Sequence, residues 1–387
     1  MQSYDVIVLG LGAMGSATVY QLSRLGVSVL GLDQYTPPHA FGSTHGDTRI
    51  TRLAVGEGME YVPLVRRSHA IWRELERESG ASLLTQCGGL LLSVADGRGL
   101  QGDAGFLGRT IAAAQEFGID HRVLDADDIA TRFPQFSITG TERGYYEPAA
   151  GYLRPERCVE TQLTLARRRG ADLHFGERVT AFDDDGGGVS VTTDTGSYRA
   201  DTLVVAAGPW VLSLVPDLSP QPSVHRQVLY WFDVDEPGAL ASYADMPVFI
   251  WEFGTGSEDF FYGFPMVDGP TGGLKVATES YRSPTSPADV ERQVSQHEID
   301  EMYDAYVRPR MPGVSRRCVK TRTCLYTVAP GGRFLVGPHP RLRNVIVASP
   351  CSGHGFKHSA ALGEVLAQLS TSGASYIDVS AFALDGR

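Results

Sequence analysis

The stretch GLGAMG, close to the start of the chain, restricts the fold more than any other feature of the sequence. It places Gly10, Gly12 and Gly15 after a short apolar run, YDVIVLG, that is typical of a buried strand, and before a segment with helical spacing of apolar residues. Asp33 ends the next predicted strand, 18 residues after Gly15. Glycines let the backbone approach a pyrophosphate, a helix N-terminus favours its charge, and the acid binds ribose hydroxyls. The pattern predicts a dinucleotide site, with a plain glycine-rich turn as the alternative, and does not choose between NAD and FAD.

Further along, the pattern of apolar residues predicts alternating helices and strands. Helices are expected over 61–79, around TIAAAQEFG, from Pro155 onwards, near 297–309 and over AALGEVLAQLS. Strands are expected at GGLLLSV, between 171 and 205, in segments between 211 and 320, and at NVIVASP. We expect an α/β (α+β) fold: a Rossmann-like dinucleotide-binding domain with an inserted, mostly antiparallel substrate domain. The first would comprise residues 1–80, 150–212 and 320–387, and the second residues 81–149 and 213–319.

Composition excludes several classes of protein. The net charge is −11 and no long basic run occurs, which argues against nucleic acid as a main partner. Five cysteines without CxxC or zinc-type spacing indicate neither a disulfide framework nor a metal site. The opening MQSYDVIVLG has no basic region of a signal peptide, and no apolar stretch is long enough to span a membrane. A cytoplasmic protein with no membrane partner is therefore expected.

Several basic residues and one cysteine have two interpretations on residue type alone. A helix beginning near Asp47 would put Arg49 and Arg52 on one face, either as a solvated face or as a local site for an anion. Lys275, within a predicted strand, is expected to point outward into solvent; pointing inward, it would be a functional candidate. Lys357 precedes a helix and is either a solvated lysine or part of a site for negative charge. Cys324 is expected to be a small buried side chain.

These pieces together resemble the monomeric sarcosine oxidase family of flavin amine oxidases, which includes N-methyltryptophan oxidase and belongs to the D-amino-acid oxidase superfamily. The resemblance covers nearly the whole chain. It rests on GLGAMG with Asp33, PPHAFGSTHGDTRITR, GEGMEYVPL, YGFP followed by GLK, TCLYT, and SGHGFKHS before the last helix. This ordered set is more specific than any single motif. It implies FAD rather than NAD, and a monomer.

The resemblance also implies roles for individual residues. Cys324 matches a cysteine bonded to the 8α-methyl carbon of the flavin, and Lys275 matches a lysine held over the flavin that promotes reaction with oxygen. Arg49 and His45 match residues close to the flavin. The residues expected to bind the cofactor are Gly10, Gly12, Gly15, Asp33, Ser43, Thr48, Arg49, Val179, Cys324, His354, Gly355 and Lys357. Those expected at the substrate are Arg52 and Lys357 on its carboxylate, with Tyr262, Tyr326, Gly353 and Glu279.

Two positions depart from the family pattern. The family commonly has two histidines before GDTR, and the first is Thr44 here. Sarcosine oxidases carry a histidine four residues after the lysine that matches Lys275, where this chain has Glu279. If Glu279 faces the pocket, it adds a possible anion, and a substrate with a larger or basic side chain becomes plausible. An unchanged substrate preference in Glu279→Gln would contradict this hypothesis.

The resulting prediction is FAD-dependent oxidation of the C–N bond of a secondary, N-methyl amino acid such as sarcosine or N-methyltryptophan, with O₂ reduced to H₂O₂. A hydride equivalent would leave the carbon next to nitrogen, and the imine would hydrolyse. The alternatives are an oxidase of a primary or cyclic amino acid (glycine, proline or pipecolate type) and a flavin dehydrogenase that passes electrons to a partner protein. A flavoprotein that only binds ligand and an NAD-linked dehydrogenase fit the basic residues and Cys324 less well.

Overall fold

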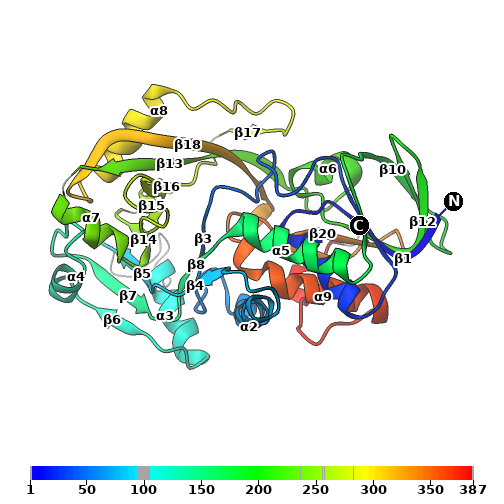
Figure 1. Ribbon diagram of the computed structural model, residues 1–387. Coiled ribbons are helices and arrows are strands. Elements are labelled where there is room, and N and C mark those ends of the chain that lie inside the picture. Colours follow the sequence, from blue (N-terminus) through cyan, green and yellow to red (C-terminus); the bar gives the residue numbers. More distant parts are fainter. Residues whose placement is uncertain are drawn as a thin grey trace.

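The computed structural model describes residues 2–94, 105–235, 237–254, 256, 258–281 and 283–385, and Figure 1 shows two lobes, each built around a sheet. Both chain ends lie in the lobe that contains β1 (Figure 1). The α-helices are α1 (Ala13–Arg24), α2 (Val62–Ser79), α3 (Phe106–Glu116), α4 (Ala126–Arg132), α5 (Pro155–Arg168), α6 (Val211–Leu214), α7 (Pro237–Ala244), α8 (Gln296–Glu301) and α9 (Ser359–Ser372). Short helical turns are η1 (Met59–Tyr61), η2 (Gly208–Trp210), η3 (Met302–Val307), η4 (Pro330–Gly332), η5 (Phe356–His358) and η6 (Ser380–Phe382). The predicted mixture of helices and strands is confirmed.

The first sheet has the strand order β10-β11-β12-β1-β2-β9, with β20 beside β12 and β19 beside β20. Its strands are β1 (Gln2–Leu9), β2 (Val29–Asp33), β9 (Asp172–Phe175), β10 (Val179–Asp184), β11 (Val189–Thr193), β12 (Ser197–Val205), β19 (Leu335–Pro338) and β20 (Val345–Ser349). Strands β20, β12, β1, β2 and β9 are parallel to one another. Strands β2 and β20 are fully buried, as expected where helices cover a parallel sheet. Their carboxyl ends form the edge at which such sheets bind ligands.

The second sheet has the order β17-β13-β16-β15-β14-β5-β7-β6, with β18 beside β13, and is antiparallel except for the β14–β5 pair. Its strands are β5 (Gly89–Ser93), β6 (Arg122–Leu124), β7 (Arg143–Glu147), β13 (Ser223–Val234), β14 (Val248–Glu252), β15 (Phe260–Gly263), β16 (Leu274–Ala277), β17 (Pro284–Thr285) and β18 (Val314–Val328). The long pair β13–β18 extends toward the first lobe (Figure 1). The predicted domain bounds stay a prediction, and β18 runs across the bound at residue 320.

A small third sheet, β3-β8-β4, lies between the first and second sheets (Figure 1). It shows that one prediction from the sequence is wrong. Its strands are β3 (Arg49–Thr51), β4 (Leu84–Thr85) and β8 (Gly151–Leu153). The helix predicted to begin near Asp47 is therefore wrong, because β3 pairs with β8. Gly46 and Asp47 have φ angles of 97° and 70°, a left-handed conformation that cannot start a right-handed helix. Residues three apart along an extended chain point to opposite sides, so Arg49 and Arg52 do not share a face.

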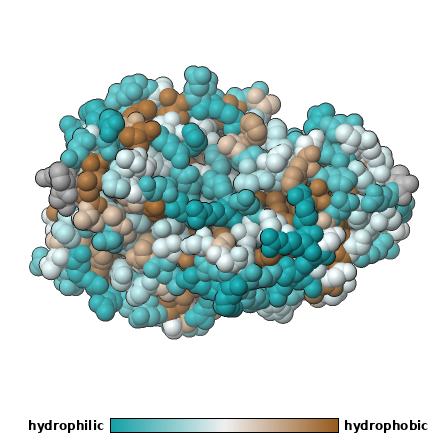
Figure 2. Space-filling model, viewed as in Figure 1, coloured by the Kyte–Doolittle hydropathy of each residue, from teal (hydrophilic) through white to brown (hydrophobic). Residues whose placement is uncertain are grey.

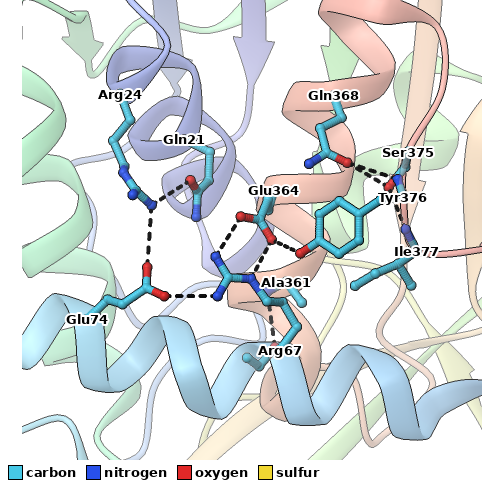
Figure 3. A network of polar contacts seen from close by, with 11 residues as sticks. Gln21, Arg24, Arg67, Glu74, Ala361, Glu364, Gln368, Ser375, Tyr376 and Ile377 are labelled. Atoms are coloured by element: carbon cyan, nitrogen blue, oxygen red, sulfur yellow. Dashed lines mark hydrogen bonds and ion pairs between the residues drawn. The ribbon is translucent and has the colours of Figure 1, made fainter.

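Helices α2 and α9 are joined by a polar network, which Figure 3 shows together with its contacts to α1 and the C-terminal segment. Arg67 on α2 donates to both carboxylate oxygens of Glu364 on α9, at 2.7 and 2.8 Å, and to Glu74 at 2.9 Å. Tyr376 also donates to Glu364. Helix α2 begins shortly after Glu57 in the chain, and α9 begins shortly after Lys357. The network therefore joins the two helices that lie next to these residues in the sequence.

Polar residues cover most of the face in Figure 2, with apolar residues in small separate groups. Within the described ranges, no helix combines the length and the apolar character needed to cross a membrane.

Candidate functional site

Two cavities lie along the edge where the parallel strands end. The larger, of about 760 Å³, lies between the first and second sheets, and the smaller, of about 430 Å³, lies over the turn after β1. Both are lined by Ser43, Thr44, Ala206 and Gly208. Because the two cavities share part of their walls, they are described together below as one elongated cleft.

The smaller cavity lies beside the glycine turn and Asp33, the residues expected to bind pyrophosphate and ribose. It is lined by Gly10, Gly12, Asp33, Ser43 and Val179, which are among the residues expected to bind the cofactor. Asp33 is buried and its carboxylate accepts from the backbone N–H of Leu11 at 2.8 Å and of Tyr35 at 2.9 Å. The N-cap of α1 is Gly12, which has no side chain to cap the helix, and the N–H of Ala13 donates to Thr44 Oγ1 at 3.3 Å. The partial positive charge of this helix N-terminus suits a phosphate.

Gly15 does not line either cavity but determines the shape of the turn. A Cβ atom there would lie 1.7 Å from the carbonyl oxygen of Gly10, so only glycine allows α1 to pass this close to the end of β1. In a GxGxxG motif the third glycine allows the helix to pack closely against the strand.

The larger cavity has polar wall atoms that the protein leaves without hydrogen bonds. Within the described part of the chain, Ser43 Oγ, Ser349 Oγ and His354 Nδ1 are buried without a hydrogen bond, and the nearest carboxylate oxygen to His354 Nδ1, Glu57 Oε1, lies 3.8 Å away. Buried polar atoms are nearly always paired in native proteins. Their position along this cavity fits a polar ring system bound there, so the residues present fit a flavin at this end of the cleft.

Arg49 lies in the wall of the larger cavity, where its side chain folds back on the preceding turn. Its guanidinium donates to the carbonyl oxygens of Ser43 and Thr48, both at 2.8 Å. His45 lies behind this wall and lines neither cavity. Burial, followed by the charges of Arg49 and Lys275, lowers the pKa of His45 to about 3, so its imidazole is neutral at pH 7.

Lys275 points into the protein, so its predicted exposure to solvent is wrong. The side chain on β16 is only 2% exposed. Its Nζ donates to the carbonyl oxygens of Gly46 at 2.6 Å and Thr48 at 2.8 Å, and to Thr48 Oγ1 at 3.1 Å. Burial, and then Arg49, hold the lysine pKa well below its usual value. Three acceptors around one nitrogen match the three donors of the ammonium form.

Arg52 and Lys357, termed the cation pair below, both line the larger cavity. Both contact the same carboxylate: Arg52 Nη2 donates to Glu57 Oε2 at 2.6 Å, and Lys357 Nζ donates to Glu57 Oε1 at 3.0 Å. Lys357 also donates to the carbonyl oxygen of His354 at 3.0 Å, and the Arg52 guanidinium lies 5.1 Å from the ring centre of Phe106. The predicted pair of cations is therefore assembled around a carboxylate that belongs to the protein.

Tyrosines from the second sheet form the wall opposite the first sheet. Tyr262 on β15 and Tyr326 on β18 line the larger cavity, with hydroxyl oxygens 3.4 Å apart. Cys324 on β18 is completely buried beside them and lines neither cavity. Burial raises the pKa of its thiol, and Arg49 and Lys275 oppose that shift.

The remaining predicted residues also reach the larger cavity. Its walls include Thr48, Glu279, Gly353, His354 and Gly355. Lys275, His45, Cys324 and Gly15 stand behind the walls of the two cavities rather than in them.

Three glutamates that the sequence interpretation did not assign shape this site. Glu57 bridges the cation pair; Glu156 accepts from the N–H of Gly46 at 2.6 Å and of Asp47 at 3.1 Å. Glu147 accepts from the N–H groups that follow Arg52 and fixes the turn there. Only Glu57 had a signal in the sequence, a carboxylate between two glycines five residues after Arg52. The other two depend on contacts about a hundred residues apart.

The fold and cleft define a class of protein, and comparison with known families agrees. The family model described as "FAD dependent oxidoreductase" (DAO) matches residues 5–369. The chain therefore belongs to this family of FAD-dependent oxidoreductases, and the predicted family, enzyme class and FAD dependence are confirmed.

Individual relatives cover nearly the whole chain. The monomeric sarcosine oxidase of Streptomyces avermitilis is 37% identical over 383 residues, which are 98% of this chain and 97% of the relative. The N-methyl-L-tryptophan oxidase of Salmonella heidelberg is 33% identical, covering 98% of both chains. Among solved structures, NikD, an amino acid oxidase of nikkomycin biosynthesis, matches with a TM-score of 0.85 at 26% identity over 100% of this chain and 98% of NikD. The glycine oxidase of Geobacillus kaustophilus, at 19% identity, covers all of both chains with a TM-score of 0.79 and supports the fold alone.

Proposed function

We propose that this protein oxidises the C–N bond of an N-methyl amino acid, with reduction of O₂ to H₂O₂. The observation that carries the proposal is the cation pair in the wall of the larger cavity, next to the flavin end of the cleft. An arginine fork and a lysine ammonium together suit the carboxylate of an amino acid. Full-length similarity to sarcosine and N-methyltryptophan oxidases supports the same class of substrate. We also propose a monomer, as the name of the first of these relatives implies.

The residues of the elongated cleft would hold FAD along its length. Asp33 and the α1 N-terminus suit the ribose and pyrophosphate, while Ser43, Arg49 and His354 suit the ring system. When bound, FAD supplies the two-electron acceptor for the amine and returns the electrons to oxygen. A covalent bond to Cys324 is part of the proposal. Its support is the family match and the cations Arg49 and Lys275 near the thiol, because nearby positive charge favours the reactive thiolate.

Substrate binding would begin with displacement of Glu57 from the cation pair. Since Arg52 and Lys357 already share a carboxylate, the incoming carboxylate would take the position of a group of the same charge, and Glu57 would give up its contacts with both cations. Tyr262 and Tyr326 would exclude water from the opposite side of the substrate. Lys275 would supply a fixed positive charge near the flavin during reaction with oxygen, where superoxide develops negative charge.

The test is anaerobic mixing of the purified yellow protein with sarcosine, N-methyl-L-tryptophan, other N-methyl amino acids, proline, pipecolate and glycine, followed by flavin absorbance. Bleaching by an N-methyl member supports the proposal. Bleaching by proline, pipecolate or glycine alone would favour an oxidase of cyclic or primary amino acids. Slow recovery of colour on admitting air would indicate a dehydrogenase instead of an oxidase. No bleaching by any compound would contradict the proposal.

A further inference from the structure

Glu279 lies two residues beyond β16, in the wall of the larger cavity. Its Oε2 accepts a hydrogen bond from the hydroxyl of Tyr281 at 2.5 Å. Its Oε1 faces Gly353: a Cβ built on that glycine would lie 3.1 Å from Oε1 and 3.1 Å from Cε2 of Tyr326. The second oxygen of this carboxylate is thus held against the tyrosine wall of the cavity, beside the loop that carries Lys357.

The negative charge of Glu279 is less well compensated by nearby cations than the negative charge of Glu57. Glu57 contacts both cations of the pair, whereas the hydrogen bond found for Glu279 comes from a neutral phenol. Burial raises the pKa of Glu279, and the Tyr281 hydrogen bond opposes this shift. The titratable and charged groups around it are Tyr281, Glu57, Lys357, Arg52, Tyr262, Tyr326 and Cys324.

The proposed reaction requires the amine of the substrate to lose one proton. An amino acid arrives with its amine protonated, since the pKa of an alkyl ammonium is about 10. Oxidation at the carbon next to nitrogen needs the neutral amine with its free electron pair. The cation pair can hold the carboxylate of the substrate but cannot accept a proton from its ammonium group.

We propose that Glu279 binds the ammonium group of the substrate and takes one proton from it before oxidation. One N–H bond breaks, its electron pair stays on nitrogen, and one O–H bond forms on the carboxylate. This inference rests on the proposed function and adds a catalytic residue to it. It gives Glu279 a role in the reaction itself, in place of recognition of a basic side chain.

Tyr281 provides a way out for this proton. Tyr281 is 41% exposed as a residue, and its hydroxyl, which contacts Glu279, also lies 3.2 Å from a Cβ built on Gly353. Protonated Glu279 can donate to the tyrosine oxygen while the phenol gives its own proton to water. Glu279 is then ionised again for the next substrate.

The test compares wild type and Glu279→Gln as holoenzymes, by anaerobic flavin reduction with sarcosine and N-methyl-L-tryptophan between pH 6 and 10. The second-order rate constant of the wild type should stay nearly level from neutral pH to about pH 8, because the zwitterion binds and is deprotonated in place; above that pH, loss of the Lys357 charge lowers the constant in both proteins. In Glu279→Gln only the neutral amine reacts, so the ratio of its constant to that of the wild type should fall tenfold per pH unit below the amine pKa. This ratio should be about a thousandfold lower at pH 7 than at pH 10 for an amine pKa of about 10.

Two further variants separate this role from a structural one. Glu252→Gln removes another carboxyl that lines the same cavity, on β14, and should keep the pH profile of the wild type. Tyr281→Phe removes the hydrogen bond that favours ionised Glu279, so the acid limb of the profile should move to higher pH. Methoxyacetate, which keeps the carboxylate and lacks the amine, should bind Glu279→Gln at least as tightly as wild type.

A Glu279→Gln profile parallel to that of the wild type would overturn the inference and leave the proposed function intact. Wild-type flavin that none of the amines reduces would remove the proposed function, and the inference with it. Equal tenfold slopes in Glu252→Gln and Glu279→Gln would show a general effect of cavity charge and would also overturn the inference.

Discussion

Oε1 of Glu57 accepts a hydrogen bond from Nζ of Lys357 at 3.0 Å, in the place where a substrate carboxylate is expected. Its other oxygen is bound by Arg52. The positive charge of the cation pair is therefore matched within the protein. A carboxylate ligand must compete with Glu57, so the affinity of the cavity for anions depends on this residue as much as on the two cations.

Replacement of Glu57 should strengthen binding of a simple carboxylate. In Glu57→Gln the amide competes weakly with an anion for Arg52 and Lys357, because a hydrogen bond to a charged group is worth about 1.5–3 kcal/mol against about 1 kcal/mol for a neutral one. We expect the Kd of methoxyacetate at pH 6.5, followed by the flavin spectrum, to fall about tenfold, which is 1.4 kcal/mol. An unchanged or higher Kd would mean that Glu57 does not occupy the binding position.

Carboxylate binding should weaken at alkaline pH. Burial, followed by Arg52, lowers the pKa of Lys357 to about 8, while Glu57 opposes the shift. The lysine is charged below that pKa and neutral above it, so affinity should be level below about pH 8 and fall above it. Titrations with methoxyacetate between pH 6 and 10 measure this effect. Lys357→Met should bind more weakly at pH 7 and lose the alkaline decline; a decline that persists in this variant would assign it to another group.

Lys275 should affect the reaction with oxygen more than the reaction with substrate. Its three acceptors hold the ammonium in one place, and removal of a preorganised charge from a reaction centre costs about 10²–10³ in rate. For Lys275→Met we expect reoxidation of reduced flavin by air-saturated buffer to slow by about that factor, measured by stopped flow. Anaerobic reduction in the same preparation is the control, since equal losses in both would point to a general disturbance of the cleft.

Covalent attachment can be tested with a matched pair of cysteines. Cys324 and Cys351 belong to the same group of packed side chains, and Cys351 also lines the larger cavity. After acid precipitation the yellow colour should stay with wild type and with Cys351→Ser, and should go to the supernatant with Cys324→Ser. Retention of colour by Cys324→Ser, or its loss from wild type, would refute the proposed bond.

The sequence allowed prediction of parts of the fold that depend on local pattern. GLGAMG and Asp33 predicted the strand, turn and helix at the dinucleotide end because glycine spacing and apolar periodicity are local properties. The run GDTRITR was misjudged as a helix because the positive φ of Gly46 and Asp47 depends on a distant partner, Glu156, which accepts from both backbone N–H groups.

The candidate site could be predicted only as far as residue type and family resemblance reach. Lys275 looked like a solvated strand residue because its neighbours in sequence do not reveal the acceptors at Gly46 and Thr48, more than two hundred residues away. Glu57 lay within a quoted motif, GEGMEYVPL, yet its contact with Lys357 spans three hundred residues. Charges brought together by tertiary structure leave no mark in local spacing.

The network in Figure 3 should stabilise the site from outside, through α2 and α9. Arg67 binds Glu364 with two hydrogen bonds and is partly exposed, so its removal should lower the free energy of unfolding by about 1 kcal/mol. Burial would raise the pKa of Glu364, but Arg67 and Tyr376 outweigh it and hold that pKa below its usual value. A carboxyl with a lowered pKa stabilises the fold above its unfolded pKa and loses this contribution as pH falls. The difference in free energy of unfolding between wild type and Arg67→Ala, measured with denaturant, should therefore shrink from pH 7 to pH 4.

The control is Arg77→Ala, which replaces an exposed arginine in the last turn of the same helix. It should change stability by less than about 0.5 kcal/mol at either pH. A pH-independent loss in Arg67→Ala would assign its effect to packing of the arginine stem rather than to the ion pair.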